Sequence, residues 1–183
     1  MLSMKSFIDK EVFSKLQEDI SLLDVILSSI DIECTKSNWT FRPTEDESGE
    51  RFIITQPTIF PEDAIFPGKY LEPLPKDIQQ RVYDTLELIF KENIFGEGYY
   101  RSHIELQFTP PGKFWKPHYH KDHKINITVP VWPISSTGTI FYNGTEEIEL
   151  NWEQNTATIF TDELHSFGND TNNFRWTINI FCG

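Results

Sequence analysis

All five histidines in this chain lie in its second half, and three of them fall within six residues. These three are His118, His120 and His123, and Asp122 stands between the last two. In an extended segment, side chains spaced by two residues leave from the same face and can converge with a side chain of a neighbouring strand. His165 is the natural partner for such a cluster. The pattern therefore predicts a metal site.

Two combinations of these side chains would hold a metal ion. His120 and Asp122 with His165 give two imidazoles and one carboxylate. His118 and His120 with His165 give three imidazoles. Either set covers one face of the ion and leaves positions open for a substrate and O2, which is the arrangement used for non-haem Fe(II). The sequence therefore predicts iron and leaves open which pair joins His165.

A lone arginine stands in the apolar final segment, residues 174–181. A guanidinium in such a segment is costly unless it meets an anion. Arg175 and Thr177 share a face of a strand, so they fit a bidentate clamp for a carboxylate with a supporting hydroxyl. The alternatives are that Arg175 pairs with a structural carboxylate, Asp162 or Glu163, or points outward from the sheet.

Taken in order, these residues resemble the Fe(II)/2-oxoglutarate-dependent oxygenases, whose pattern is HxD, a distal His and then an Arg in an RxS-like context. The resemblance covers about residues 99–183. Within that superfamily the chain is most similar to the aspartyl/asparaginyl β-hydroxylase and bacterial proline hydroxylase group, through the stretches PPGKFWKPH, ITVPVW and FTDELHSFGND. One departure matters. Alignment from Gly112 makes His118 the first ligand and puts His120 where the family has its acid, whereas HxD read literally pairs His120 with Asp122.

The resemblance implies Fe(II) and 2-oxoglutarate as cofactors, with Arg175 and Thr177 binding the distal carboxylate of the keto acid while its other end chelates the metal. The implied reaction hydroxylates an amino-acid, peptidyl or other small-molecule substrate and releases succinate and CO2. Further candidates, by their position near the expected pocket, are Asn126 for 2-oxoglutarate and, for the substrate, Arg101, Trp115 and Trp132.

Two other functions compete with this one. The spacing from Gly112 through His118 to His120 also resembles the first motif of cupins, whose metals are commonly held by three histidines. Cupins carry a glutamate soon afterwards, where this chain has Lys124 and Ile125. A cupin-like three-histidine metalloenzyme that does not use 2-oxoglutarate is one alternative. A non-catalytic jelly-roll binding module is the other.

From Tyr99 onward, short segments rich in Ile, Thr, Val, Phe and Trp alternate with Pro, Gly, Asn and Asp. The connections are mostly too short for a crossover helix, so the strands must pair antiparallel, and the economical closed solution is a jelly roll of two sheets. The expected fold class is therefore mainly β, a double-stranded β-helix (jelly roll, cupin-like). The expected strands are 103–108, 114–119, 125–132, 138–142, 146–152, 156–161, 164–167 and 174–181.

Apolar residues at steps of three and four predict helices over residues 5–30 and 76–93, which would pack on one outer face of the jelly roll. A short strand is expected at 52–55, between loops. We expect a single domain over 1–183, with a helical N-terminal portion and loops at 1–98 and a jelly-roll catalytic core at 99–183.

Composition limits the function classes. The chain has 183 residues, 38% of them hydrophobic, which fits one soluble globular domain. Its formal charge of −12 would repel nucleic acid and anionic membranes, so a small-molecule or peptidyl partner is expected. An early charged N-terminus and the absence of a long apolar run predict a cytoplasmic protein. Oligomeric state is not predictable from these features.

Overall fold

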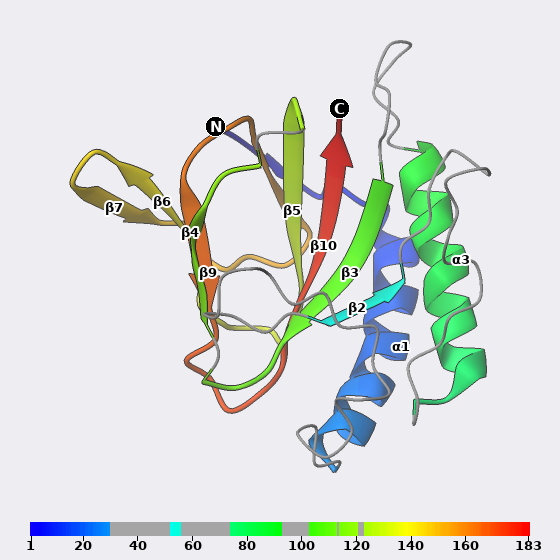
Figure 1. Ribbon diagram of the computed structural model, residues 1–183. Coiled ribbons are helices and arrows are strands. Elements are labelled where there is room, and N and C mark those ends of the chain that lie inside the picture. Colours follow the sequence, from blue (N-terminus) through cyan, green and yellow to red (C-terminus); the bar gives the residue numbers. More distant parts are fainter. Residues whose placement is uncertain (30–51, 56–73, 93–102, 113, 121–122) are drawn as a thin grey trace.

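The computed structural model describes residues 1–29, 52–55, 74–92, 103–112, 114–120 and 123–183. Two antiparallel sheets face each other, and two helices cover one of them (Figure 1). The larger sheet has the strand order β1-β8-β5-β10-β3-β2, and the smaller has the order β4-β9-β6-β7. From β3 to β10 the chain crosses repeatedly between the sheets, which is the jelly roll predicted from the sequence.

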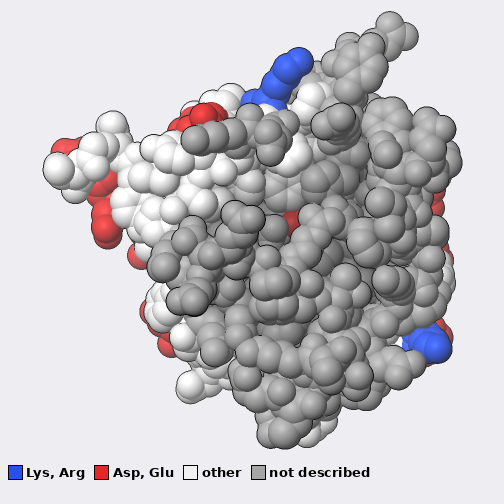
Figure 2. All heavy atoms as spheres, in the orientation of Figure 1, with Lys and Arg blue, Asp and Glu red and all other residues white. Residues whose placement is uncertain are grey.

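All eight strands expected in the second half are confirmed, with ends shifted by at most a few residues. They are β3 (His103–Thr109), β4 (Phe114–His118), β5 (Ile125–Trp132), β6 (Thr139–Asn143), β7 (Glu146–Glu149), β8 (Thr156–Phe160), β9 (His165–Gly168) and β10 (Arg175–Cys182). The short β2 (Phe52–Thr55) is also confirmed and pairs with β3. Strands β6 and β7 form a hairpin that projects from the body and carries exposed glutamates, visible in red in Figure 2.

The N-terminus differs from the expectation. The helix expected from residue 5 is α1 (Lys10–Ser28), and the residues before it form a strand, β1 (Leu2–Lys5), at the edge of the larger sheet beside β8. The helix begins late because the Asp9 carboxylate caps it, accepting the backbone N–H groups of Glu11 and Val12. The second helix, α3 (Lys76–Glu92), lies within one residue of its expected bounds.

The larger sheet has one apolar face and one polar face. On β3 and β10, alternate residues such as Leu106, Trp176 and Ile178 are buried in one core cluster with the apolar stripes of α1 and α3. The helices therefore cover the outer face of this sheet, as predicted (Figure 1). The main hydrophobic core lies between sheet and helices.

The opposite face of the larger sheet looks into the jelly roll and is polar. One row of directly paired residues crosses five strands, from β1 to β8, β5, β10 and β3: Ser3, Thr158, Thr128, Asn179 and Glu105. A sheet whose inner face carries hydroxyl, amide and carboxyl groups cannot form a hydrophobic core with the other sheet, because buried polar groups need hydrogen-bond partners. The interior is therefore suited to holding a polar ligand.

A buried carboxyl ties α1 to the sheet. The Trp176 indole Nε1 donates a 2.8 Å hydrogen bond to Asp24 Oδ1. Burial raises the pKa of Asp24, and the hydrogen bonds from the Trp176 and Trp132 indoles offset part of this shift. Because the pKa of Asp24 is higher in the folded protein than its unfolded value of 3.8, the unfolded chain ionises first as the pH rises. The folded protein therefore loses stability above pH 3.8.

We expect Asp24→Asn to unfold at a higher temperature than the wild type at pH 7, since the amide oxygen still accepts from Trp176 and carries no charge. The difference should shrink as the pH falls towards 3.8, the unfolded pKa, where both states become protonated. Thermal melts between pH 3.5 and 7 measure this. As a control, Asp24→Leu leaves the buried indole N–H without its acceptor and should cost about 1–3 kcal/mol at every pH. An increase in melting temperature for Asp24→Asn that is the same at every pH would contradict the raised pKa of Asp24.

Candidate metal centre and ligand pocket

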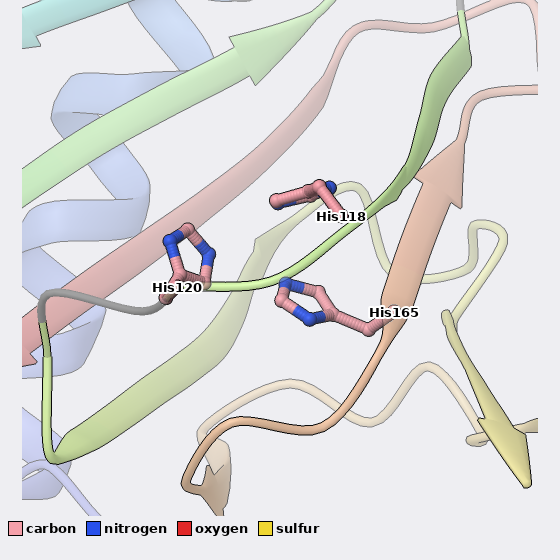
Figure 3. Close-up of side chains that lie close together, drawn as sticks. All are labelled: His118, His120 and His165. Carbon is pink, nitrogen blue, oxygen red and sulfur yellow. The ribbon is translucent and has the colours of Figure 1, made fainter.

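Three histidine side chains converge inside the jelly roll (Figure 3). His118 ends β4 and lies directly opposite His165, the first residue of β9. His120 follows two residues after His118 and turns its ring toward both. One ring nitrogen from each residue lies within 4.8 Å of the other two. Three imidazole nitrogens at this separation can bind one transition-metal ion.

His165 is oriented for ligation by its backbone neighbourhood. Its Nδ1 lies 2.9 Å from the carbonyl oxygen of Glu163, which can only accept, so Nδ1 carries the proton and Nε2 presents its lone pair. Burial lowers the pKa of His165, partly offset by Glu163. The ring is therefore neutral at pH 7, which is the form that binds metals.

Aromatic rings wall the centre on several sides. The ring of Phe160 lies 4.7 Å from that of His165, and the ring of Phe181 lies 5.0 Å from that of His120. Phe141 contacts His165 from the smaller sheet, at 5.7 Å. An apolar wall of this kind limits the access of water and strengthens electrostatic interactions at the centre.

Arg175 is buried inside the sandwich, with 2% of its surface exposed. Its guanidinium lies 4.9 Å from the ring centres of both Trp152 and Phe167. Its Nε donates a 3.0 Å hydrogen bond to the Thr137 carbonyl, and one terminal nitrogen makes a long 3.5 Å contact with Thr139 Oγ1. Burial lowers the pKa of Arg175 to about 9. The guanidinium thus points inward, with aromatic rings against its faces and its own N–H donors along its edge.

No carboxylate among the described residues pairs with Arg175. Of the two structural partners considered from the sequence, Glu163 instead accepts from the Thr161 backbone N–H at 2.6 Å and meets the N-terminal ammonium at 3.4 Å, and Asp162 is exposed. A buried charge without a counter-charge is costly. The arrangement is therefore prepared for an anionic ligand.

One pocket joins the histidines to the arginine. It encloses about 380 Å³ of empty space including its mouth, and it is narrow, with room for the centres of roughly one or two water molecules. The Phe167 ring, 6.5 Å from His118 and 4.9 Å from the guanidinium, lies between the two ends. Its polar lining includes Thr177, Asn126, Gln107, Thr128, Thr139 and Asn179.

Asn126 presents an unsatisfied acceptor in this pocket. The side chain is 1% exposed, its Nδ2 donates to the Thr161 carbonyl at 2.8 Å, and its buried Oδ1 has no hydrogen-bond partner among the described residues. Because the Thr161 carbonyl only accepts, the amide cannot be turned around without losing this bond. Asn126 therefore offers an oxygen to a donor, such as an N–H, an O–H or a water.

The other predicted residues are not all brought to the pocket. Trp132 lies on the helix side, because a bulge in the pairing of β5 with β10 places it opposite Trp176 and it then meets Asp24. Trp115 belongs to β4, but its side chain lies outside the described part of the structure. Arg101 and Asp122 lie outside the described residues altogether.

Several pocket residues were missed from the sequence. Gln107, Thr139 and Asn179 line the space between the histidines and Arg175 but belong to no motif. For Gln107 and Asn179 the signal that could have found them is the alternation of apolar and polar residues in HIELQFT and RWTINI, whereas Thr139 lies in β6, outside these stretches. Since the apolar members face the helices, the polar members must face the jelly-roll interior.

Gly138 lies between Thr137 and Thr139, whose oxygens face the Arg175 guanidinium. A Cβ atom at Gly138 would overlap the backbone carbonyl of Leu150, which cannot move independently. We expect Gly138→Ala to destabilise the fold by about 1–3 kcal/mol, as overpacking does. The measurement is urea unfolding.

Gly168→Ala is the matched control, because its Cβ would meet only the ring of Phe114, an exposed side chain that can turn away. An equal or larger loss of stability in this control would contradict the backbone argument for Gly138.

The fold is shared with solved prolyl hydroxylases. A prolyl-4-hydroxylase from Pseudomonas putida matches with a TM-score of 0.52 at 12% identity, covering 99% of this chain and 90% of that one. A prolyl hydroxylase from Trichoplax adhaerens, in complex with a hypoxia inducible factor peptide fragment, matches with a TM-score of 0.52 at 8% identity, covering 99% and 82%. No family model and no curated protein matches the sequence.

At these identities the likeness shows the fold, an oxygenase-like jelly roll, which is the fold that the sequence motifs implied. Among the described residues, neither helix is long and apolar enough to cross a membrane. The function therefore has to be inferred from the chemistry of the pocket.

Proposed function

We propose that this chain is a non-haem Fe(II)- and 2-oxoglutarate-dependent dioxygenase that hydroxylates an amino-acid, peptidyl or other small-molecule substrate. One observation carries the proposal. A single pocket has three convergent imidazoles at one end and, at the other, a buried arginine that no described carboxylate neutralises. A metal-chelating keto acid with a second carboxylate has complementary groups at both ends.

The donor set fits iron. His118, His120 and His165 would hold the metal through neutral imidazole nitrogens and leave the remaining positions open. The alternative pairing of His120 and Asp122 with His165 stays a prediction, since Asp122 lies outside the described residues. When bound, iron would supply the activation of O2 that drives oxidative decarboxylation of the keto acid to succinate and CO2.

The charges of the pocket fit a dianion. Three neutral imidazoles leave the double charge of Fe(II) uncompensated, and Arg175 adds another positive charge at the far end. The Arg175 fork would bind the distal carboxylate of 2-oxoglutarate, with the Thr177 hydroxyl on the same face of β10 as a further donor. The stacked rings of Trp152 and Phe167 fix the plane of the fork.

The narrowness of the pocket sets a condition on binding. A keto acid of five carbons needs more room than one or two waters, so lining side chains must move apart when it enters. Phe167 stands between the two ends and is the side chain whose rotation would open the path. With the ligand in place, Phe160 and Phe181 would keep water from the metal.

The Asn126 amide offers the pocket both an acceptor and a further donor. Both ends of 2-oxoglutarate present only acceptor oxygens at neutral pH, and Asn126 Oδ1 is itself an acceptor. Its Oδ1 would therefore accept from a water or a substrate donor, whereas a contact with the keto acid would come from the second N–H of its Nδ2. Because two of the structural neighbours are prolyl hydroxylases, peptidyl proline is the first substrate class to test.

The direct test is turnover. Iron-loaded protein should consume O2 and form succinate from 2-oxoglutarate, faster with a productive substrate from a panel of amino acids and proline-containing peptides. Omission of iron, of O2 or of the keto acid should each abolish succinate formation. The same assay on Arg175→Met protein is the control for free iron. Equal succinate formation by that variant would overturn the proposal.

The second candidate is a three-histidine, cupin-like metalloenzyme that does not use 2-oxoglutarate. It is favoured by one specific observation, that the described triad contains imidazoles alone. It predicts O2 consumption, or another metal-dependent conversion, that is independent of 2-oxoglutarate and yields no succinate. It leaves the unpaired Arg175 unexplained, which is why we place it second.

A further inference from the structure

A second cavity lies against Arg175, outside the histidine pocket. It encloses about 900 Å³ including its mouth, compared with about 380 Å³ for the histidine pocket. Its walls come from the inner face of β1, β8 and β5, from the segment 150–153, and from Gly138 and Thr139. None of the described residues that line it is a histidine.

Arg175 forms the boundary between the two spaces. It lines both, together with Thr128 and Thr139. The two rings that contact its guanidinium divide in the same way, because Phe167 lines the histidine pocket and Trp152 lines the second cavity. An anion can therefore reach this buried charge from a space that contains no metal ligand.

The chemistry of the second cavity is mixed. Hydroxyl groups line the strand side, and on β1 and β8 two of them, Ser3 and Thr158, are direct cross-strand partners. Apolar surface comes from Pro130, Leu150 and Trp152. Its charged side chains are Arg175 and the half-exposed Glu153, and the rest of its lining is apolar, hydroxyl or amide. A concave space with a few polar groups in an otherwise apolar lining is typical of a small-molecule site.

We propose that this cavity binds a small monocarboxylate, with its carboxylate on Arg175 and its apolar body against Trp152 and Leu150. Binding needs no metal. Because the same guanidinium would serve 2-oxoglutarate in the proposed function, the two ligands compete, and the monocarboxylate acts as an inhibitor of that reaction.

The preference for a ligand with a single carboxylate follows from Glu153, which lines the cavity. Half of the Glu153 side chain is exposed, and its ion pair with Lys5 at 2.9 Å is solvent-accessible and so a weak counter-charge. A second carboxylate on the ligand would meet Glu153 in a chain whose formal charge is −12. A dicarboxylate is therefore disfavoured here, although the histidine pocket favours one.

The probes are benzoate and its neutral isostere benzamide, titrated calorimetrically into the full chain with and without Mn(II). Benzoate should bind with the same affinity in both conditions, and benzamide at least about tenfold more weakly, a difference of about 1.4 kcal/mol. Glutarate should bind this cavity more weakly than benzoate in metal-free protein, and Glu153→Gln should narrow that gap.

Two variants of the exposed strand β1 locate the site without disturbing the core. Ser3→Phe places a ring in the mouth of the cavity and should weaken benzoate binding by at least about tenfold. Met4→Phe is the matched control, because Met4 pairs with Ala157 on the opposite face of the sheet and does not line the cavity, so benzoate should bind it as it binds the wild type.

Three results would overturn the inference: no benzoate binding, equal binding of benzamide, or binding that Ser3→Phe leaves unchanged. Each is separate from a failure of the proposed function. Metal-dependent binding of 2-oxoglutarate that survives Ser3→Phe would keep the oxygenase proposal even if benzoate does not bind. Benzoate binding without any response to 2-oxoglutarate would keep the second cavity and remove the oxygenase proposal.

Discussion

His165→Ala should abolish stoichiometric metal binding and lower the affinity for Mn(II) or Fe(II) by more than about a hundredfold, since loss of even an outer-shell partner costs 10–100-fold. His165 is the residue on which the centre depends, because it is 4% exposed, lies opposite His118 and has its tautomer set by the Glu163 carbonyl. Competition titration with a metal-binding dye measures the affinity. His123→Ala is the matched control, because His123 does not belong to the triad.

The same titration decides between the two ligand sets. If three imidazoles hold the metal, His118→Ala should lose it and Asp122→Ala should retain it. If HxD holds the metal, the outcomes should be reversed. Retention of full metal affinity in His165→Ala would contradict both sets.

Arg175→Met should lose binding of 2-oxoglutarate by about two to three orders of magnitude, because truncating one partner of a buried charge pair costs 2–5 kcal/mol. The variant should fold, since methionine keeps an apolar chain between the rings of Trp152 and Phe167. Removing a buried charge that lacks a counter-charge should also leave the ligand-free protein at least as stable as the wild type.

Calorimetry with 2-oxoglutarate and thermal melts of the ligand-free protein measure the two halves of this prediction. Arg175→Lys keeps the charge but not the planar fork, and should fall between wild type and Arg175→Met. Wild-type affinity for 2-oxoglutarate in Arg175→Met would contradict the role of the arginine. If the ligand-free variant were strongly destabilised, the guanidinium would stabilise the fold through its own contacts and would not need an anionic ligand.

Most elements of the fold could be predicted from local patterns in the sequence. Strands alternate with period two and helices with period three to four, so β3 to β10, α1 and α3 could be placed without any tertiary information. Strand β1 could not, because its four residues are all exposed and gain their structure only from pairing with β8, more than 150 residues away in the chain. Long-range pairing of a polar edge leaves no local signature.

The site divides in the same way. The three histidines share two short segments, and strand spacing was enough to predict that they converge. Trp132 shows the limit of that reasoning, because a single bulge opposite Trp176 and Thr177 turns it to the helix side, and bulges are not visible in a pattern of alternation. That Arg175 lacks a counter-charge among the described residues also depended on tertiary structure.

The most direct test of a combined metal and 2-oxoglutarate site is an anaerobic thermal melt, with and without 2-oxoglutarate, in which Mn(II) serves as a metal that does not react with O2. A ligand that binds only the native state raises the melting temperature. The account predicts a rise with metal and a further rise with 2-oxoglutarate that requires the metal. No further rise with 2-oxoglutarate in the metal-loaded protein would contradict it.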